Sequence, residues 1–383
     1  MPALESRLAK EIVERTMKII PFNVNVMDAG GVIIGSGEAS RIGEVHAGAQ
    51  LVLVRHSTVE IDRETSSALG EAKPGVNLPL TVRGKICGVV GLTGDPSAVR
   101  QFGELVRVTA EMILEQAQLT AELQRERRYR EEFVLQLIKD DSILKTDLEA
   151  WAVRLGVNFQ RPRAVIVLDL IDQSLRPDMA LIEMQRCQAQ LAIHRPDLLT
   201  AAISHRELIM LEIFDDSRSG TARAALSRQR LNALDAILRE TLGTPSALSM
   251  GVALTGIDGV AQSYQSAQRT FRVGRKRSPR EHLFSFYDLN LPVLLSGLES
   301  GWQAEQLRQP LQRLNAFDKR EGTLRQTLTV WFAQNGHPVA TAKALRIHRN
   351  TLDYRLRKIS ELSGLDLASI EGQLLLYAAL QLE

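Results

Sequence analysis

The sequence predicts a multidomain protein in which α/β domains are followed by an all-α region. Three observations predict this class. The 383 residues are enough for two or three domains, each with its own core. Strand patterns alternate with helical ones up to about residue 290, whereas the remainder has helical spacing only. A long helical stretch, from Ser97 to about Asp140, separates the strand-containing part into two. We therefore expect domains over residues 1–135, 136–290 and 291–383.

The composition is that of a soluble globular protein, with 44% apolar and 24% charged residues. The cysteines, Cys87 and Cys187, lie a hundred positions apart, which argues against a disulfide framework and favours a reducing, cytoplasmic location. We find neither an apolar leader nor a stretch long enough to span a membrane. The histidines show no metal-ligand spacing, so no metal or cofactor is expected.

The first region has the pattern of a small α/β domain. A helix over residues 3–20 precedes a strand at Phe22–Met27, a turn at residues 28–31 and a second strand at residues 32–35. Residues 51–54 have the composition of another strand, and residues 77–83 and 85–92 form a second hairpin around Arg83-Gly84. A few antiparallel strands between helices resemble sensor domains of the PAS or GAF kind.

Several polar residues of this region could hold a ligand. Arg41 and His46 lie in one short segment, and Asn77 begins a strand just after Lys73-Pro74-Gly75. Glycines near Gly35-Ser36-Gly37 and at Gly88, Gly91 and Gly94 permit close approach of backbone to a bound molecule, or they serve turns and packing alone. A lone arginine or histidine is usually surface decoration, so the pattern leaves both a binding and a surface role open.

The runs Asn23-Val24-Asn25-Val26-Met27-Asp28, Arg41-Ile42-Gly43-Glu44-Val45-His46 and Gly75-Val76-Asn77 resemble the sugar-diacid recognition domain of the carbohydrate diacid regulators. The resemblance implies a ligand such as glucarate, galactarate or glycerate. An aldaric acid has a carboxylate at each end and hydroxyls between them, so its pocket calls for cationic and amide donors, and arginine binds carboxylates bidentately. We expect the ligand at Arg41 and His46 first, then Asn77, followed by Asn23, Asn25 and Lys73.

The long helix begins at Asp95-Pro96-Ser97, a cap followed by a proline at the first helical position. Leu105, Met112 and Leu119 recur every seven residues, and residues 124–132 are highly charged. The helix either caps the sensor and continues as a plain linker, or forms a parallel dimer seam that carries the sensor state onward.

The middle region has the order β-α-ββ-α-β-α, which resembles a degenerate GGDEF-like domain. Its hairpin reads Ser204-His205-Arg206-Glu207, without the glycine pair of an active cyclase, and Asp169 alone does not make a two-metal site. We therefore expect no enzyme activity and assign no catalytic residue. The basic run from Arg269 to Arg280 is interpreted as a solvated helix end, with DNA contact as the alternative.

The last region contains the most informative pattern. A short helix from Pro338, a connection at residues 346–348 and a helix over about residues 349–362 have the arrangement of a helix-turn-helix, with Leu352, Leu356 and Ile359 on one face. Residues 338–362 carry a net charge of +4, whereas the whole chain carries +2. A helical hairpin with a solvated basic face is the alternative interpretation. We expect this region's core to contain Trp302, Leu307, Leu311, Leu314, Leu324, Leu328, Trp331 and Phe332, and the last helix to pack through Leu374, Leu375, Tyr377, Ala378 and Leu380.

Residues 324–382 also resemble the C-terminal helix-turn-helix of purine-catabolism-regulator type, notably in Ile347-His348-Arg349-Asn350-Thr351-Leu352. This resemblance implies double-stranded DNA as partner. The expected base or phosphate contacts are Arg349, Asn350, Thr351, Tyr354 and Arg355, and the expected phosphate contacts are Arg346, Arg357 and Lys358. Together the resemblances imply a homodimeric transcriptional activator of sugar-diacid uptake and breakdown. A nucleotide-cyclase-like enzyme and a sensor of another small acid are the alternatives.

Overall fold

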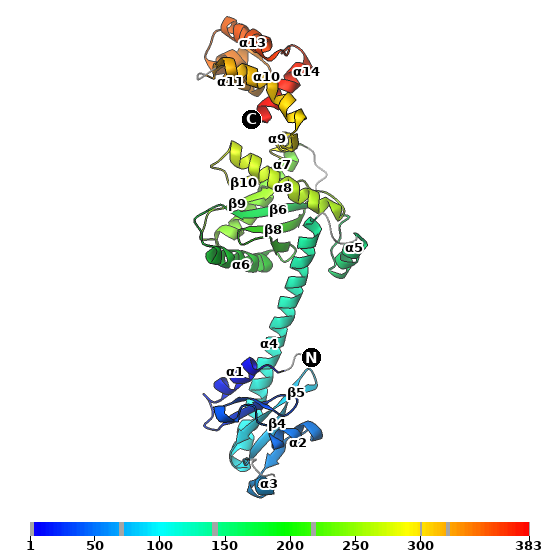
Figure 1. Ribbon diagram of the computed structural model, residues 1–383, viewed down its shortest axis with the longest axis vertical. Helices are drawn as coiled ribbons and strands as arrows, with labels where there is room; N and C mark the ends of the chain where they lie inside the picture. The colour runs from blue at the N-terminus through cyan, green and yellow to red at the C-terminus, as the bar shows by residue number, and fades with distance from the viewer. Residues whose placement is uncertain are drawn as a thin grey trace. The chain divides into compact units, whose positions relative to one another are not determined.

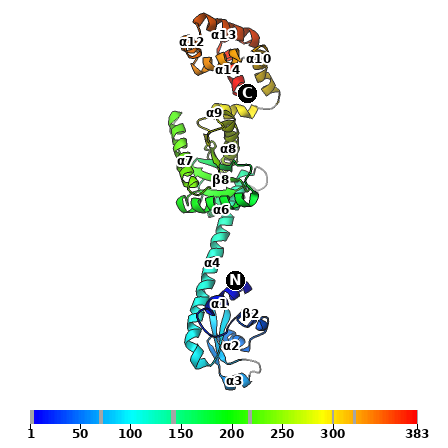
Figure 2. The same ribbon diagram turned by 90° about the vertical axis from the view of Figure 1, so that its left-hand side faces the viewer.

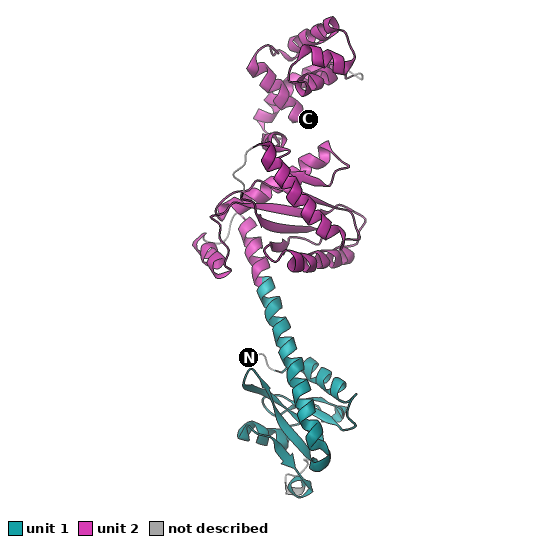
Figure 3. Cartoon of the chain, turned by 180° about the vertical axis from the view of Figure 1, so that it is seen from behind, with its two compact units in different colours: residues 1–128 teal, residues 129–383 magenta. Residues whose placement is uncertain are grey.

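The computed structural model describes residues 4–68, 73–139, 145–215, 220–298, 301–318 and 322–382. The chain divides into two compact units, residues 1–128 and 129–383 (Figure 3). The boundary falls inside a single helix, α4 (Pro96–Ile138). Among the described residues, none of the helices is both long and apolar enough to cross a membrane.

The first unit is built on a five-stranded antiparallel sheet with the order β2-β1-β5-β4-β3 (Figure 1). Its strands are β1 (Val24–Met27), β2 (Ile33–Ser36), β3 (Val59–Ile61), β4 (Gly75–Val82) and β5 (Lys85–Thr93). The hairpins β1–β2 and β4–β5 are those that the sequence predicts. Their pairing through β1 and β5 places the two hairpins side by side in one sheet.

Helices cover both faces of this sheet (Figure 2). On one face, α1 (Ser6–Thr16) and the first part of α4 pack through Ile12, Val106 and Ala110. On the other face, α2 (Ala47–Arg55) packs through Ala49 and Val52, and α3 (Arg63–Ala68) follows β3. The α/β class is confirmed for this unit, whereas a specific likeness to PAS or GAF sensors stays a prediction.

The strand expected at residues 51–54 is wrong, because these residues belong to helix α2. Ala49 and Val52 are fully buried, and Val54 is 80% exposed. Residues three apart share one face of a helix, which accounts for this burial pattern. A short apolar run is compatible with either structure, and here the cap at His46 places the run in a helix.

The middle domain contains a second five-stranded sheet, with the order β10-β9-β6-β8-β7. Its strands are β6 (Arg163–Leu170), β7 (Leu199–Ala202), β8 (Glu207–Ile213), β9 (Ser246–Met250) and β10 (Leu283–Ser285). One face packs against α6 (Pro177–His194) and α7 (Thr221–Arg239). The other packs against α8 (Asp258–Arg277), α5 (Lys145–Arg154) and the end of α4 around Phe133. The predicted order of elements is confirmed.

The C-terminal domain is helical, as predicted. It comprises α9 (Asn290–Leu295), α10 (Trp302–Asp318), α11 (Thr323–Ala333), α12 (Pro338–Leu345), α13 (Arg349–Ser363) and α14 (Ile370–Gln381). Its core includes Leu311, Leu314, Leu328, Ile359 and Leu376.

Two of the expected core residues of this domain are wrong. Trp302 is 71% exposed and Leu374 is 62% exposed. In α14 the buried positions are Gly372, Leu376 and Ala379, which follow the helical period, and Leu374 lies two residues out of phase with them. Trp302 is likewise two residues before the buried Ala304.

Candidate functional site: a polar row under helix α2 and an exposed helix-turn-helix face

A row of polar residues crosses the sheet of the first unit. Asn25 of β1 and Asn77 of β4 both pair with Gly91, which lies between them on β5. Both amides are buried, at 1% and 3% exposure. A Cβ at Gly91 would lie 2.6 Å from Asn77 Oδ1, so the glycine leaves the space that the amide occupies. We call Asn25, Gly91 and Asn77 the polar row.

Hydrogen bonds extend the polar row towards β2. Asn25 Oδ1 accepts from Asn23 Nδ2 at 3.2 Å and from Ser36 Oγ at 2.7 Å. Ser36 Oγ in turn accepts from the backbone N–H of Glu38 at 3.0 Å. Asn23 Oδ1 is buried and has no hydrogen-bond partner among the described residues. The network therefore ends in an acceptor with unused capacity.

Arg41 presents a donor with unused capacity. It ends the short 3₁₀ turn Ala39–Arg41, and its side chain is only 12% exposed. Nε lies 3.4 Å from Glu44 Oε2, whereas Nη1 is buried and has no partner within the described part of the chain. A buried donor that is left unpaired costs about 1–3 kcal/mol, which a bound carboxylate would recover.

His46 caps helix α2 and is neutral at physiological pH. Its Nδ1 accepts from the backbone N–H of Ala49 at 3.3 Å, so the proton of the neutral ring is on Nε2. Burial, and then the neighbouring Arg41 charge, lower the pKa of His46 to about 4. The first turn of α2 also approaches the polar row, since a Cβ at Gly48 would lie 2.6 Å from Asn77 Nδ2. A helix N-terminus favours anions.

Lys73 is engaged in an ion pair. Its ammonium is 2.8 Å from Glu38 Oε2, and this pairing lowers the pKa of Glu38. Lys73 also lines a cavity of about 770 Å³ together with Pro74, Thr93, Asp95 and Arg100. Of the six predicted ligand residues, Lys73 alone lines this cavity. Asn23 is one hydrogen bond away from it, because its carbonyl accepts from the N–H of the lining residue Thr93 at 3.0 Å.

The six predicted ligand residues fall into separate groups in the first unit. Asn23 and Asn25 share hydrogen bonds, and Asn77 lies across Gly91 from Asn25. Arg41 is electrostatically coupled to His46 and to Glu38. The sequence did not predict that Ser36 bonds Asn25 or that the N-terminus of α2 lies beside Asn77. Both contacts depend on the order of the strands and on the position of helix α2.

The C-terminal helix pair presents a polar face. His348 caps α13, its Nδ1 accepting from the N–H of Asn350 at 3.3 Å, and Gly364 ends the helix in the left-handed region. Leu352 and Ile359 are fully buried beneath it. The predicted contacts that are exposed are Arg346, Arg349, Asn350, Thr351, Tyr354 and Arg357.

Two other predicted DNA contacts have partners within the domain. Arg355 Nη1 donates to Thr327 Oγ1 of α11 at 3.2 Å. Lys358 is 3.0 Å from Glu361 Oε2, and its ammonium lies over the ring of Phe317 at 5.2 Å from the centroid. The contacts with Thr327 and Phe317 hold α13 against α11 and α10, and Arg355 and Lys358 are less exposed than Arg349 and Tyr354.

The hairpin of the middle domain has its polar groups engaged. Arg206 donates to the carbonyls of Asp172 and Leu175, both at 2.5 Å. Tyr264 donates to Glu207 Oε1 at 3.1 Å. Burial raises the pKa values of Asp169 and of Glu207, which lie opposite each other on β6 and β8. The Arg206 guanidinium therefore ties the β7–β8 hairpin to the loop that follows β6.

Comparison with known proteins gives matches along almost the whole chain. The family for sugar diacid recognition matches residues 4–137, the GGDEF-like domain matches residues 140–273, and the PucR C-terminal helix-turn-helix domain matches residues 324–382. The carbohydrate diacid regulator of Escherichia coli K12 is 44% identical over 380 residues, covering 99% of this chain and 98% of the relative.

Two further relatives extend the comparison. An uncharacterised protein of Haemophilus influenzae is 36% identical over 99% of both chains. The DNA-binding transcriptional activator AdeR of Bacillus subtilis is 27% identical and matches 52% of this chain and 48% of its own length.

Proposed function

The chain belongs to the carbohydrate diacid regulator family of transcriptional regulators, and from this premise we propose that it activates genes for sugar-diacid uptake and breakdown when a diacid binds the sensor unit. The proposal includes binding to double-stranded DNA as a homodimer, through the exposed face of α13. The relatives that carry names are regulators, which supports a non-enzymatic function.

The unused hydrogen-bonding capacity of the sensor carries this proposal. Arg41 Nη1 is a buried donor and Asn23 Oδ1 a buried acceptor, and neither has a partner among the residues described. A diacid offers carboxylates for the guanidinium and hydroxyls for the amide oxygen. In this binding mode, His46 donates through Nε2 to a second oxygen, and Asn77 lies with the α2 N-terminus at the polar row.

A thermal-shift screen tests the ligand. The full chain is heated with glucarate, galactarate, glycerate and neutral hexoses. We expect the diacids to raise the melting temperature and the neutral sugars to leave it unchanged, because only carboxylates pair with Arg41. Glycerate has a single carboxylate, so a shift with glycerate alone would favour a regulator of the same design that senses another small acid. No shift with any acid would contradict the proposal.

A mobility-shift assay tests DNA binding. We expect Arg349→Ala and Tyr354→Ala to weaken operator binding, since both side chains extend from the exposed face of α13. Glu371→Ala, at an exposed position at the start of α14, is the matched control and should bind as the unaltered protein does. Equal binding by all variants at moderate salt would remove α13 as the reading helix. Incubation with GTP and Mg²⁺, followed by product analysis, tests the enzymatic alternative.

A further inference from the structure

Helix α4 carries an uncovered apolar stripe on its outer face. Leu105, Val108, Met112, Leu119 and Leu123 are all exposed, Met112 by 65% and Leu123 by 68%. Their spacing follows the helical period, so they share one side of the helix over roughly 27 Å, at about 1.5 Å per residue. We call these five residues the outer stripe. A continuous row of large apolar side chains marks an interaction surface far more often than scattered exposed residues do.

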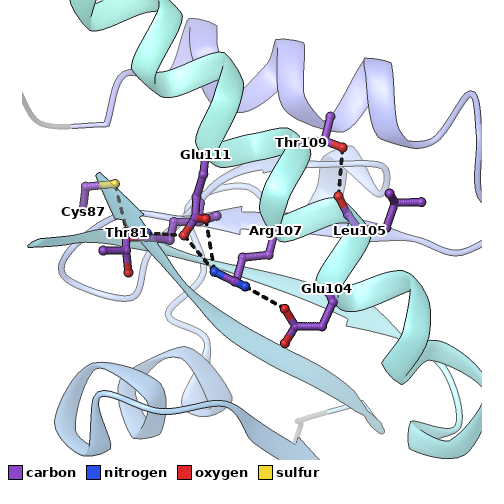
Figure 4. Close-up of polar contacts among 8 residues, drawn as sticks. Thr81, Cys87, Glu104, Leu105, Arg107, Thr109 and Glu111 are labelled. Atoms are coloured by element: carbon purple, nitrogen blue, oxygen red, sulfur yellow. Dashed lines mark hydrogen bonds and ion pairs between the residues drawn. The ribbon is translucent and has the colours of Figure 1, made fainter. Parts of the chain in front are cut away.

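The helix cannot turn this stripe inward, because its opposite face is already occupied. Val106, Ala110 and Leu114 are buried in the core of the sensor unit. Glu111 Oε1 accepts from the backbone N–H of Thr81 at 2.8 Å, which ties the helix to strand β4. Arg107 bridges Glu111 and Glu104, as Figure 4 shows. These contacts fix the rotation of α4 about its own axis and leave the stripe facing outward.

The two edges of the outer stripe differ in charge. Glu104, Glu115 and Glu122 lie along one edge, and Thr109, Gln116 and Thr120 lie along the other. Glu122 also pairs with Arg83 at 2.9 Å, so the turn between β4 and β5 lies along the acidic edge. Glu104 pairs with Arg107 and Glu122 with Arg83, so this edge keeps the negative charge of Glu115 and is bordered by the sheet of the first unit, while the other edge is neutral.

This asymmetry makes the stripe complementary to a second copy of itself in one orientation. In a parallel pair related by a two-fold axis along the helices, the acidic edge of each copy faces the neutral edge of the other. In an antiparallel pair, acidic edge meets acidic edge, and the β4–β5 turns of both copies fall on the same side. The parallel arrangement avoids the contact between the two acidic edges and keeps the two β4–β5 turns on opposite sides.

We propose that the outer stripe of α4 is the contact surface of a parallel, in-register homodimer. The role of this dimer rests on the proposed function, because a two-fold symmetric regulator suits a two-fold symmetric operator. The contact itself requires neither a diacid nor DNA, so it is tested without them.

Site-directed cross-linking tests the surface and its orientation. In a background of Cys87→Ser and Cys187→Ala, whose folding is checked by circular dichroism, one cysteine is introduced at Met112 or at Leu119. We expect each variant to form a disulfide-linked dimer upon oxidation, because in-register parallel helices bring each position next to its own copy. Val54→Cys, also apolar and exposed but on α2, is the matched control and should stay monomeric on a non-reducing gel.

An antiparallel pair would cross-link at no more than one of the two positions, since they lie about 10 Å apart along the helix. Failure at either position, or equal cross-linking at Val54, would overturn the proposal.

A second variant in the otherwise native chain keeps the test decisive if the cysteine-free background does not fold. Met112→Glu with Leu119→Glu places carboxylates in the seam without disturbing the buried face of α4. We expect light scattering to report a monomer, whereas Val54→Glu leaves the dimer intact. A dimer that persists in the double variant overturns the proposal. A chain that dimerises but binds no diacid would contradict only the proposed function.

Discussion

The first unit and the middle domain are each built on a five-stranded sheet with an arginine in a nearby turn, yet the two arginines differ in their hydrogen bonds. In the sensor, Arg41 Nη1 and Asn23 Oδ1 are buried without partners in the described structure. In the middle domain, Arg206 is committed to the carbonyls of Asp172 and Leu175. A guanidinium that already closes a loop must break those bonds before it can bind anything else.

Spare hydrogen-bonding capacity, more than residue type, distinguishes Arg41 of the proposed ligand site from Arg206 of the middle hairpin, although the middle domain also contains buried atoms without partners in the described structure, such as Glu212 Oε2 and Ser249 Oγ. Both regions offer an arginine beside a carboxylate, and a residue count would not tell them apart. An unpaired buried donor costs about 1–3 kcal/mol of stability, and a ligand that pairs with the donor offsets this cost. The sensor has that feature, and the middle hairpin does not.

The largest expected effect tests this contrast directly. Arg41→Ala should weaken the most effective diacid roughly a thousandfold, about 4 kcal/mol, because a buried carboxylate loses its cationic partner. Arg206→Ala should leave the affinity unchanged while lowering the melting temperature, since its role is to hold a loop. Isothermal titration calorimetry on both variants measures this. Equal diacid affinities in the two variants would show that Arg41 contributes no more to ligand binding than Arg206 does.

The next effect concerns pH. The folded pKa of His46, about 4, is below the unfolded value of about 6.5, so the unfolded chain binds the extra proton first as pH falls. The stability contributed by a neutral His46 is thus lost between about pH 6.5 and 4, by about 3 kcal/mol. His46→Asn retains a capping oxygen without the titration.

We expect urea unfolding of the His46→Asn variant to be less sensitive to acid than that of the unaltered protein. The raised pKa of Glu207 has the opposite sign, since it reduces stability as pH rises through the ordinary range of a glutamate. Glu207→Gln should therefore not flatten the acid limb. If Glu207→Gln reduced the acid sensitivity of stability as strongly as His46→Asn does, this sensitivity would not originate at His46.

A smaller effect tests the space in the polar row. Gly91→Ala should destabilise the sensor by about 2 kcal/mol, because the added methyl group overlaps Asn77 Oδ1. Gly84→Ala provides a control with a different mechanism, since nothing lies within 4 Å of its Cβ and only its φ of +76° opposes the change. Thermal unfolding with and without diacid should show reduced ligand stabilisation for Gly91→Ala only.

The smallest effect separates stability from DNA binding. Arg346 joins α12 and α13 with φ at +54°, a conformation that favours glycine. Arg346→Gly should stabilise the domain by about 0.5–1 kcal/mol and yet weaken operator binding, with a salt dependence reduced by about one phosphate contact. Unchanged binding across a salt titration would show that this arginine does not contact DNA.

The sequence predicted the hairpins, the order of the middle domain and the helix-turn-helix, because each depends on local patterns. It did not predict α2, since an apolar run of four residues suits a strand as well as a helix. The errors at Trp302 and Leu374 are errors of helical phase, which only the packing partner decides. The meeting of Asn25 and Asn77 at Gly91 depends on which strands pair, and β1 is separated from β5 by almost sixty residues.

The polar row also has a consequence for selectivity among acids. Neighbouring strands lie about 4.8 Å apart, so Asn25 and Asn77, one strand on either side of Gly91, are separated by roughly 10 Å. An extended six-carbon acid can reach towards both amides, whereas a three-carbon acid reaches only one. If a diacid binds along the polar row as proposed, this spacing favours acids long enough to reach both amides, and we expect six-carbon acids to bind more tightly than three-carbon acids.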